Sequence, residues 1–159
     1  MPEGIKRIFQ TPLDVNASSD LEEVGTIRWE GNKCYKWVQH NQRGAVATAA
    51  GQVVYYDSAG DMATDTSQIT ADWSASLKVG AGVAQSVITD TYYGWIQIKG
   101  PATLTIVLDS GADGQSLTAG PTATGVTDGS LVVNSAVTDV PVAVADDASA
   151  KEIVCDFPF

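Results

Sequence analysis

Hydrophobic and polar residues alternate with a period of two along much of this chain, which is the pattern of β-strands with one buried face. From residue 77 onward such runs recur every 8–12 residues, and Gly or Pro separates most of them. The strands expected there cover residues 77–79, 83–88, 92–98, 103–108, 115–118, 130–134, 140–144 and 152–157. This spacing predicts a mainly β fold, either a small β-barrel or a β-sandwich, without internal repeats.

The first half of the chain carries a β-hairpin signal over residues 25–38. Residues 25–29 alternate, Glu30-Gly31-Asn32 supplies a turn, and residues 33–38 return as a second strand. Ile27 and Trp29 are expected on one face of the first strand. A further strand is expected over residues 52–56.

Two short helices are expected between strands. Residues 45–50 (AVATAA) favour one helix, which Gly51 ends. Residues 57–76 are rich in Asp, Ser, Thr and Ala and predict a loop, with a weak helix over 70–74 that Trp73 anchors to the core. The Gly80-Ala81-Gly82 run is interpreted as a bend between strands.

An aromatic stretch over residues 92–102 (YYGWIQIKGPA) predicts a turn and a strand that stops at Gly100-Pro101. Adjacent residues of a strand point to opposite faces, so one of Tyr92 and Tyr93 can be buried while the other is exposed. Tyr is enriched at protein interfaces. We therefore take Tyr92, Tyr93 and Trp95 as candidate interface residues, with the alternative that Trp95 belongs to the core.

Residues 1–20 hold two prolines and no sustained alternation, and predict an extended N-terminal arm, disordered alone or ordered against a partner. Its candidate interface residues are Ile5, Ile8, Phe9 and Leu13. Residues 21–159 are expected to form a single β-rich domain, with the hairpin at 25–38 and a barrel-like core from about residue 77 onward.

The charge balance argues against several partners. The chain has 159 residues, with 9 Lys+Arg against 19 Asp+Glu and a formal net charge of -10. Nucleic-acid binding depends on Lys and Arg, and anionic membranes repel acidic proteins, so neither is expected as a partner. No signal peptide and no run of 18 apolar residues is present in this sequence, and we expect synthesis in a host cytoplasm.

Residues able to support catalysis or metal binding are few. His40 is the one histidine, and its polar neighbours predict a solvated loop rather than a catalytic triad. Asp109–Gly114 resembles the start of a calcium loop, but Gly stands at its third position and Gly120 at its twelfth. Asp57, Asp61 and Asp65, and the Asp146-Asp147 pair, fit turns. We therefore expect no catalytic residue, no metal and no cofactor.

Cys34 and Cys155 lie 121 residues apart in the chain. Free cysteine is often buried as a small apolar residue, which is the simpler interpretation. Spacing alone cannot establish a disulfide between them, so their pairing stays open.

Three motifs resemble the small capsid decoration (cement) proteins of tailed bacteriophages. Residues 25–29 (GTIRW) with 36–38 (KWV) look like the opening hairpin, residues 93–100 (YGWIQIKG) resemble the signature strand, and residues 114–120 (GQSLTAG) with 140–144 look like the closing part of the barrel. The resemblance covers roughly residues 21–159 in order, and the loop at 57–76 departs from it.

The resemblance implies a non-enzymatic structural protein on the outer capsid surface of a virion. Such proteins commonly sit as homotrimers near threefold axes and bridge neighbouring major capsid proteins, which stabilises the shell. Their N-terminal arms often add a strand to a neighbour, a role that residues 1–20 would fit.

Three alternatives remain. A head-fibre or tail-associated module would share the fold but attach at a vertex or the tail. A carbohydrate-binding β-sandwich would need several exposed aromatic side chains on one face. An enzyme of an unrecognised type would need a convergent site that the sequence does not reveal.

Overall fold

The computed structural model describes residues 8–42, 46–59, 68–106, 108, 110–120 and 128–158. Over these ranges the chain forms ten strands and no helix: β1 (Ile27–Glu30), β2 (Lys33–His40), β3 (Val53–Asp57), β4 (Gln68–Thr70), β5 (Ser76–Ala84), β6 (Tyr93–Thr103), β7 (Ser116–Ala119), β8 (Leu131–Val133), β9 (Pro141–Asp147) and β10 (Glu152–Asp156). The expected mainly β fold is confirmed.

Five of the strands close into a ring, in the order β2-β4-β3-β5-β6 and back to β2. The β2–β4 pairing is parallel and the other four are antiparallel. The expected hairpin is present, and its first strand β1 pairs with the outer part of β2. Closing the ring removes exposed strand edges from this part of the molecule.

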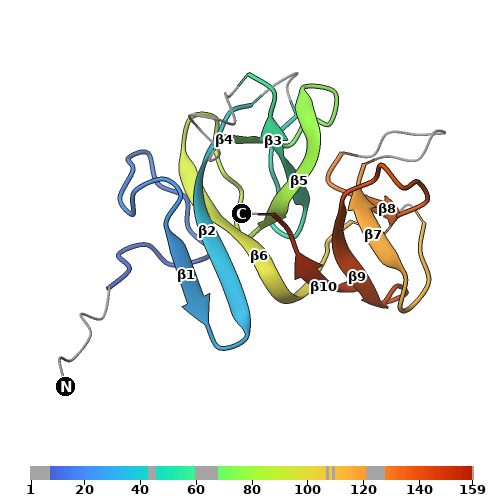
Figure 1. Ribbon diagram of the computed structural model, residues 1–159. Coiled ribbons are helices and arrows are strands. Elements are labelled where there is room, and N and C mark those ends of the chain that lie inside the picture. Colours follow the sequence, from blue (N-terminus) through green and yellow to red (C-terminus); the bar gives the residue numbers. More distant parts are fainter. Residues whose placement is uncertain are drawn as a thin grey trace.

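A second sheet continues from the end of β6, in the order β6-β10-β9-β7-β8, and lies beside the barrel (Figure 1). The long strand β6 belongs to both layers, since it pairs with β2 up to Lys99 and with β10 from Lys99 to Thr103. Gly100 lies where β6 exchanges partners, with φ of 90°, and a Cβ there would lie 2.3 Å from the Asn32 carbonyl oxygen. Glycine is therefore required at this crossing.

The prediction that this strand stops at Gly100-Pro101 is wrong, because β6 runs on to Thr103. Pro101 is tolerated because β2 pairs with β6 only as far as Lys99, and proline is accepted where a strand is paired on one side. The strand expected over 103–108 is also wrong within the described residues, because Thr103 ends β6 and residues 104–106 and 108 form no strand, while residue 107 lies outside the description. The Leu104 and Thr105 amides instead donate to the carbonyls of Lys151 and Gly51.

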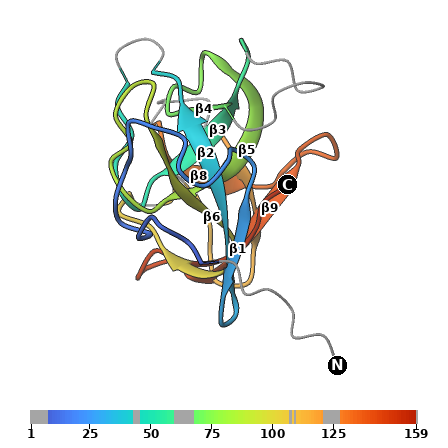
Figure 2. The same ribbon diagram turned by 90° about the vertical axis from the view of Figure 1, so that its left-hand side faces the viewer.

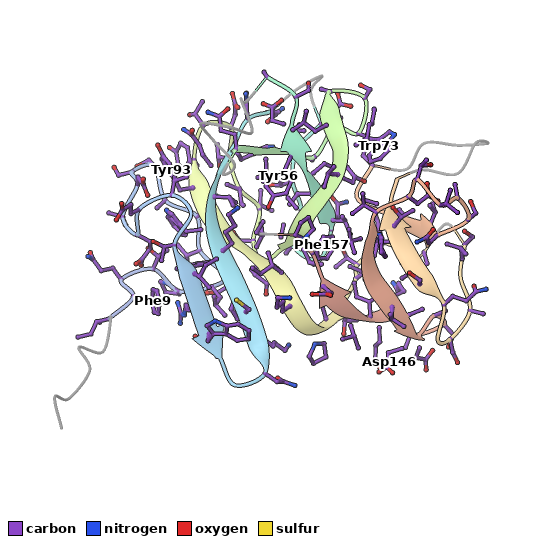
Figure 3. The ribbon with its side chains drawn as sticks, in the orientation of Figure 1. Phe9, Tyr56, Trp73, Tyr93, Asp146 and Phe157 are labelled. Carbon is purple, nitrogen blue, oxygen red and sulfur yellow. The ribbon has the colours of Figure 1, made fainter. Side chains whose placement is uncertain are left out.

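The main hydrophobic core fills the barrel and continues between the barrel and the second sheet. Strand β3 is buried on both faces: Tyr56 lies beside Lys36, with Oη 3.3 Å from Nζ, while Tyr55 packs edge-on against Trp73 at 5.1 Å. Figure 3 shows Phe157 between the two layers. A Cβ on Gly80 would lie 2.9 Å from the Phe157 ring, so glycine permits this close packing.

The bend expected at Gly80-Ala81-Gly82 is therefore wrong. These residues lie inside β5, which joins the strands expected at 77–79 and 83–88 and ends at Ala84. A Cβ on Gly82 would lie 2.8 Å from the Gln97 carbonyl oxygen of β6. Both glycines serve close packing rather than a turn.

Both helix predictions are wrong within the described residues. Residues 46–50 are irregular, while residue 45 lies outside the description, and Thr48 Oγ1 bonds both the amide and the carbonyl of Ile88. Thr70 ends β4, and Asp72 Oδ1 accepts from the Ser74 amide at 2.7 Å. Thr and Asp side chains that bond nearby backbone compete with helix formation.

Candidate functional site

The most distinctive surface of the molecule is an exposed apolar row across the second sheet. In register, Pro101 of β6 lies opposite Val154 of β10, and Val154 lies opposite Val144 of β9. Directly opposed residues of antiparallel strands share a face, so the three side chains form a continuous row. Val144 and Val154 are each 44% exposed, and Pro101 is exposed as well.

A β-bulge adds Pro141 to this surface. Leu117 pairs with Ala143 but Thr118 pairs with Pro141, so Val142 is the extra residue and both it and Ala143 are buried. The bulge changes which side chains of β9 face solvent. Pro141 and Val144 are consequently both exposed on β9. We call the exposed side chains of Pro101, Pro141, Val144 and Val154 the apolar face.

Charged residues flank the apolar face at both ends. At one end Lys99 Nζ lies 2.5 Å from Asp156 Oδ1 across β6 and β10. At the other end lie Glu152, Asp146 and Asp147, and Asp146 is seen at the lower rim of the second sheet in Figure 3. The Asp147 carboxylate accepts from Ser149 Oγ at 2.6 Å, and this bond lowers its pKa.

A shallow pocket of about 200 Å³ borders the apolar face, lined by Lys33, Pro101, Ala102, Thr103, Asp146, Glu152 and Ile153. Charges of both signs therefore stand beside apolar side chains. An apolar centre with a polar rim is the anatomy of protein–protein interfaces.

The predicted interface residues lie elsewhere, in the N-terminal segment and at the start of β6. Ile5 falls outside the described residues. Ile8 is 85% exposed, whereas Phe9, Leu13 and Tyr93 are half-buried around a second apolar cluster of Tyr35, Trp37 and Trp95.

Trp95 is 0% exposed, so the core alternative is the one observed and Trp95 offers no surface to a partner. Tyr92 packs against the main core and Tyr93 stacks on Trp37, with ring centroids 6.3 Å apart. The two tyrosines thus point to opposite faces, as predicted, but both are half-buried rather than one buried and the other exposed.

Residues 8–24, which we call the strap, lie against the outer face of β2 and β6. The Phe9 ring meets Trp95 edge-on at 5.5 Å, and Trp95 Nε1 donates to the Thr11 carbonyl at 3.2 Å. The Glu22 carboxylate accepts from the amides of Gln10 and Thr11, both at 2.6 Å. The structure therefore places the described part of the arm on its own barrel (Figure 2).

A signal for the strap was present in the sequence. Tyr35 and Trp37, and likewise Tyr93 and Trp95, repeat aromatic residues two positions apart on the face of the strand that points away from the barrel interior. Such an outward aromatic surface requires a cover, and the strap supplies it.

His40 is buried, so the prediction of a solvated loop histidine is wrong. It ends β2 and is 0% exposed, and neither ring nitrogen has a hydrogen-bond partner among the described residues. Burial lowers its pKa from the ordinary value of 6.5. No nucleophile among the described residues is bonded to it, so it forms no triad there.

The described residues contain no group of three His, Cys, Asp or Glu side chains placed to hold a metal ion. The Asp113 carboxylate of the calcium-like segment accepts from the Ala148 amide at 2.9 Å, which ties two turns together. Asp57 similarly accepts from Asn41 Nδ2 and the Ala59 amide. Asp61, Asp65 and Asp109 lie outside the described residues.

Both cysteines are free and buried, which answers the question of their pairing. Cys34 lies opposite Lys99 and Cys155 opposite Gly100, on the two sides of β6. Burial raises the pKa of the Cys34 thiol and raises that of Cys155 to about 12. Thiols in this state are poor nucleophiles.

Comparisons with known proteins add no relative: no family model matches the chain, and neither a curated protein nor a solved structure matches it. Over the described ranges, no helix has the length and apolar character needed to cross a membrane.

Proposed function

We propose that the protein is a non-enzymatic structural protein of a phage virion, which binds the outer surface of the head, bridges major capsid proteins and stabilises the shell. The observation that carries the proposal is the apolar face, where Pro101, Val154 and Val144 form an exposed row between charged ends. The sequence resemblance to capsid decoration proteins supplies the identity of the partner.

The geometry of the apolar face fits docking on another protein. Val154 and Val144 lie on β10 and β9, each paired with a strand on both sides, and Pro101 of β6 pairs with β10, so the side chains of the row are held in fixed positions before contact. Preorganised side chains lose little freedom on binding, which favours association. Repetition of one modest contact over a symmetric shell then gives strong overall attachment.

The carbohydrate-binding alternative lacks a specific observation in its favour. Trp37, Trp95, Tyr55 and Tyr56 are buried, and Trp73 is half-buried with the Lys78 ammonium 4.7 Å from its ring centroid. These side chains form no exposed aromatic platform on one face.

The experiment is binding of the purified protein to shells of the source phage assembled without it, with bound copies counted per shell. A capsid-bridging role predicts saturation at hundreds of copies, in proportion to the lattice of capsid subunits. Saturation at a dozen copies or fewer contradicts it in favour of a vertex or tail component. Absence of binding contradicts any capsid role.

A further inference from the structure

Strand β1 forms an open edge of the sheet, since within the described part of the chain it pairs with β2 alone. The Trp37 amide of β2 donates to the Thr26 carbonyl. In an antiparallel pair every second residue bonds the neighbouring strand, so this bond sets which residues of β1 bond β2. Arg28 and Glu30 therefore direct their main-chain groups toward β2, while Ile27 and Trp29 direct theirs to the open side. Figure 2 shows β1 on the side of the molecule that faces the viewer.

The side chains of this edge strand include an exposed tryptophan and a pair of opposite charges. Trp29 is 59% exposed, although tryptophan is among the residues most enriched at the energetic centres of interfaces. On the opposite face of the strand, Arg28 and Glu30 form an ion pair within the chain. An open edge with an exposed aromatic side chain is a site for strand addition.

We propose that β1 pairs antiparallel with β1 of a second copy, centred on Trp29. Trp29 then lies opposite Trp29 of the partner subunit, and the two residues exchange main-chain hydrogen bonds. Arg28 lies opposite Glu30 of the partner subunit, and Glu30 opposite Arg28 of the partner subunit. Both oppositely charged pairs occupy positions without ladder hydrogen bonds, where facing side chains come closest.

Charge complementarity selects this register over its neighbours. A shift that centres the pairing on Arg28 places two arginines opposite each other, and one that centres it on Glu30 places two carboxylates together. Like charges directly opposed destabilise a strand pair. A register shifted by a single residue sets Arg28 or Glu30 opposite Trp29 of the partner subunit. A charged side chain then lies opposite tryptophan.

This pairing goes beyond the proposed function, because no residue of β1 belongs to the apolar face and the contact joins two copies of this chain. The interface is isologous, so it closes at two copies around a twofold axis. On the outer surface of the phage head, where many copies would be bound close together, this pairing would link neighbouring copies two by two.

The test is sedimentation equilibrium of the full chain at protein concentrations up to about 1 mM, because an interface of four residues a side is weak. The wild type should dimerise. Glu30→Arg sets arginines opposite each other and should weaken dimerisation at least about tenfold. Glu152→Arg on β10 makes the same charge change on another exposed residue and should leave it unchanged.

A mixing experiment sharpens the test. Arg28→Glu should weaken dimerisation in the same way, yet an equimolar mixture of Arg28→Glu with Glu30→Arg restores both complementary pairs and should dimerise like the wild type. Because Arg28 also donates to the Thr11 carbonyl, near-UV circular dichroism must show that this variant is folded. If this variant is unfolded, hydrogen exchange of the wild type replaces the mixing experiment. The Trp29 amide should then exchange more slowly as the protein concentration rises.

A wild type that stays monomeric at every concentration overturns the proposal. So does a Glu30→Arg variant that dimerises like the wild type. Shell binding involves other residues, so either result leaves the proposed function to its own test.

Discussion

The indole rings of Trp37 and Trp95 meet edge-on with centroids 5.1 Å apart, across the register pair that joins β2 and β6. Both side chains point away from the barrel interior, yet both are 0% exposed. The strap covers them, so the segment that resembles a free arm is part of the fold. Truncation of this pair should therefore cost stability.

Trp95→Ala should lower the free energy of unfolding by about 3–5 kcal/mol, because it removes a fully buried aromatic ring and one hydrogen bond to the strap. Urea denaturation measures the change. Ile8→Ala, at an 85% exposed position of the strap, is the control and should change stability by less than about 0.5 kcal/mol. Similar values for the two variants would contradict the buried location of Trp95.

Glu22→Ala should loosen the strap, because its carboxylate accepts from two backbone amides and its removal leaves the Gln10 and Thr11 amides without that partner. The expected loss is about 1–3 kcal/mol. Hydrogen exchange should show faster exchange at these two amides while the barrel strands stay protected. Asp14→Ala changes an exposed carboxylate of the same strap and should leave both amides protected.

His40 should make stability fall as the solution is acidified. Burial depresses its pKa in the folded state below 6.5, so below that pH the unfolded chain takes up a proton that the folded chain resists. The free energy of unfolding should then decrease with falling pH, with a slope of up to about 1.4 kcal/mol per pH unit.

Urea denaturation at several values between about pH 5 and pH 7.5 measures this slope, where most carboxylates stay ionised. His40 is the chain's one histidine, so His40→Phe should remove the slope in this window. A slope that persists in His40→Phe would assign the pH dependence to other groups.

Cys34 and Cys155 should resist a thiol reagent in the folded protein, since both are buried and burial raises the pKa of both thiols. Ellman's reagent should react slowly with the native protein and should titrate both thiols after denaturation in guanidinium chloride. Fewer than two reactive thiols in the denatured, unreduced protein would show that a disulfide exists.

Alternation and turn residues in the sequence were enough to predict the fold class and the 25–38 hairpin. They were insufficient where tertiary packing determines whether a segment forms a strand or a bend. Gly80 and Gly82 look like a bend in sequence, but they lie inside β5 because Phe157 and the Gln97 carbonyl approach too closely for a Cβ. Strand β4 was missed because its three residues stand in a polar stretch and depend on pairing with β2 and β3.

The apolar face could not be predicted from the sequence either. The alternation of Val140, Val142 and Val144 implies one shared face, yet the bulge at Val142 buries that residue and leaves Val144 exposed. A bulge inverts the inside–outside assignment of every residue beyond it. The row also depends on the register of β6, β10 and β9, which bring together positions 101, 144 and 154.

We propose that the apolar face attaches the protein to the phage head, and shell binding by three folded proteins tests this proposal most directly. The wild type should saturate the shells, and Val137→Asp, a charge placed on a fully exposed loop residue, should bind equally well. The double variant Val144→Asp/Val154→Asp should lose binding, because two carboxylates would be desolvated in the contact. Wild-type binding by the double variant would contradict the claim.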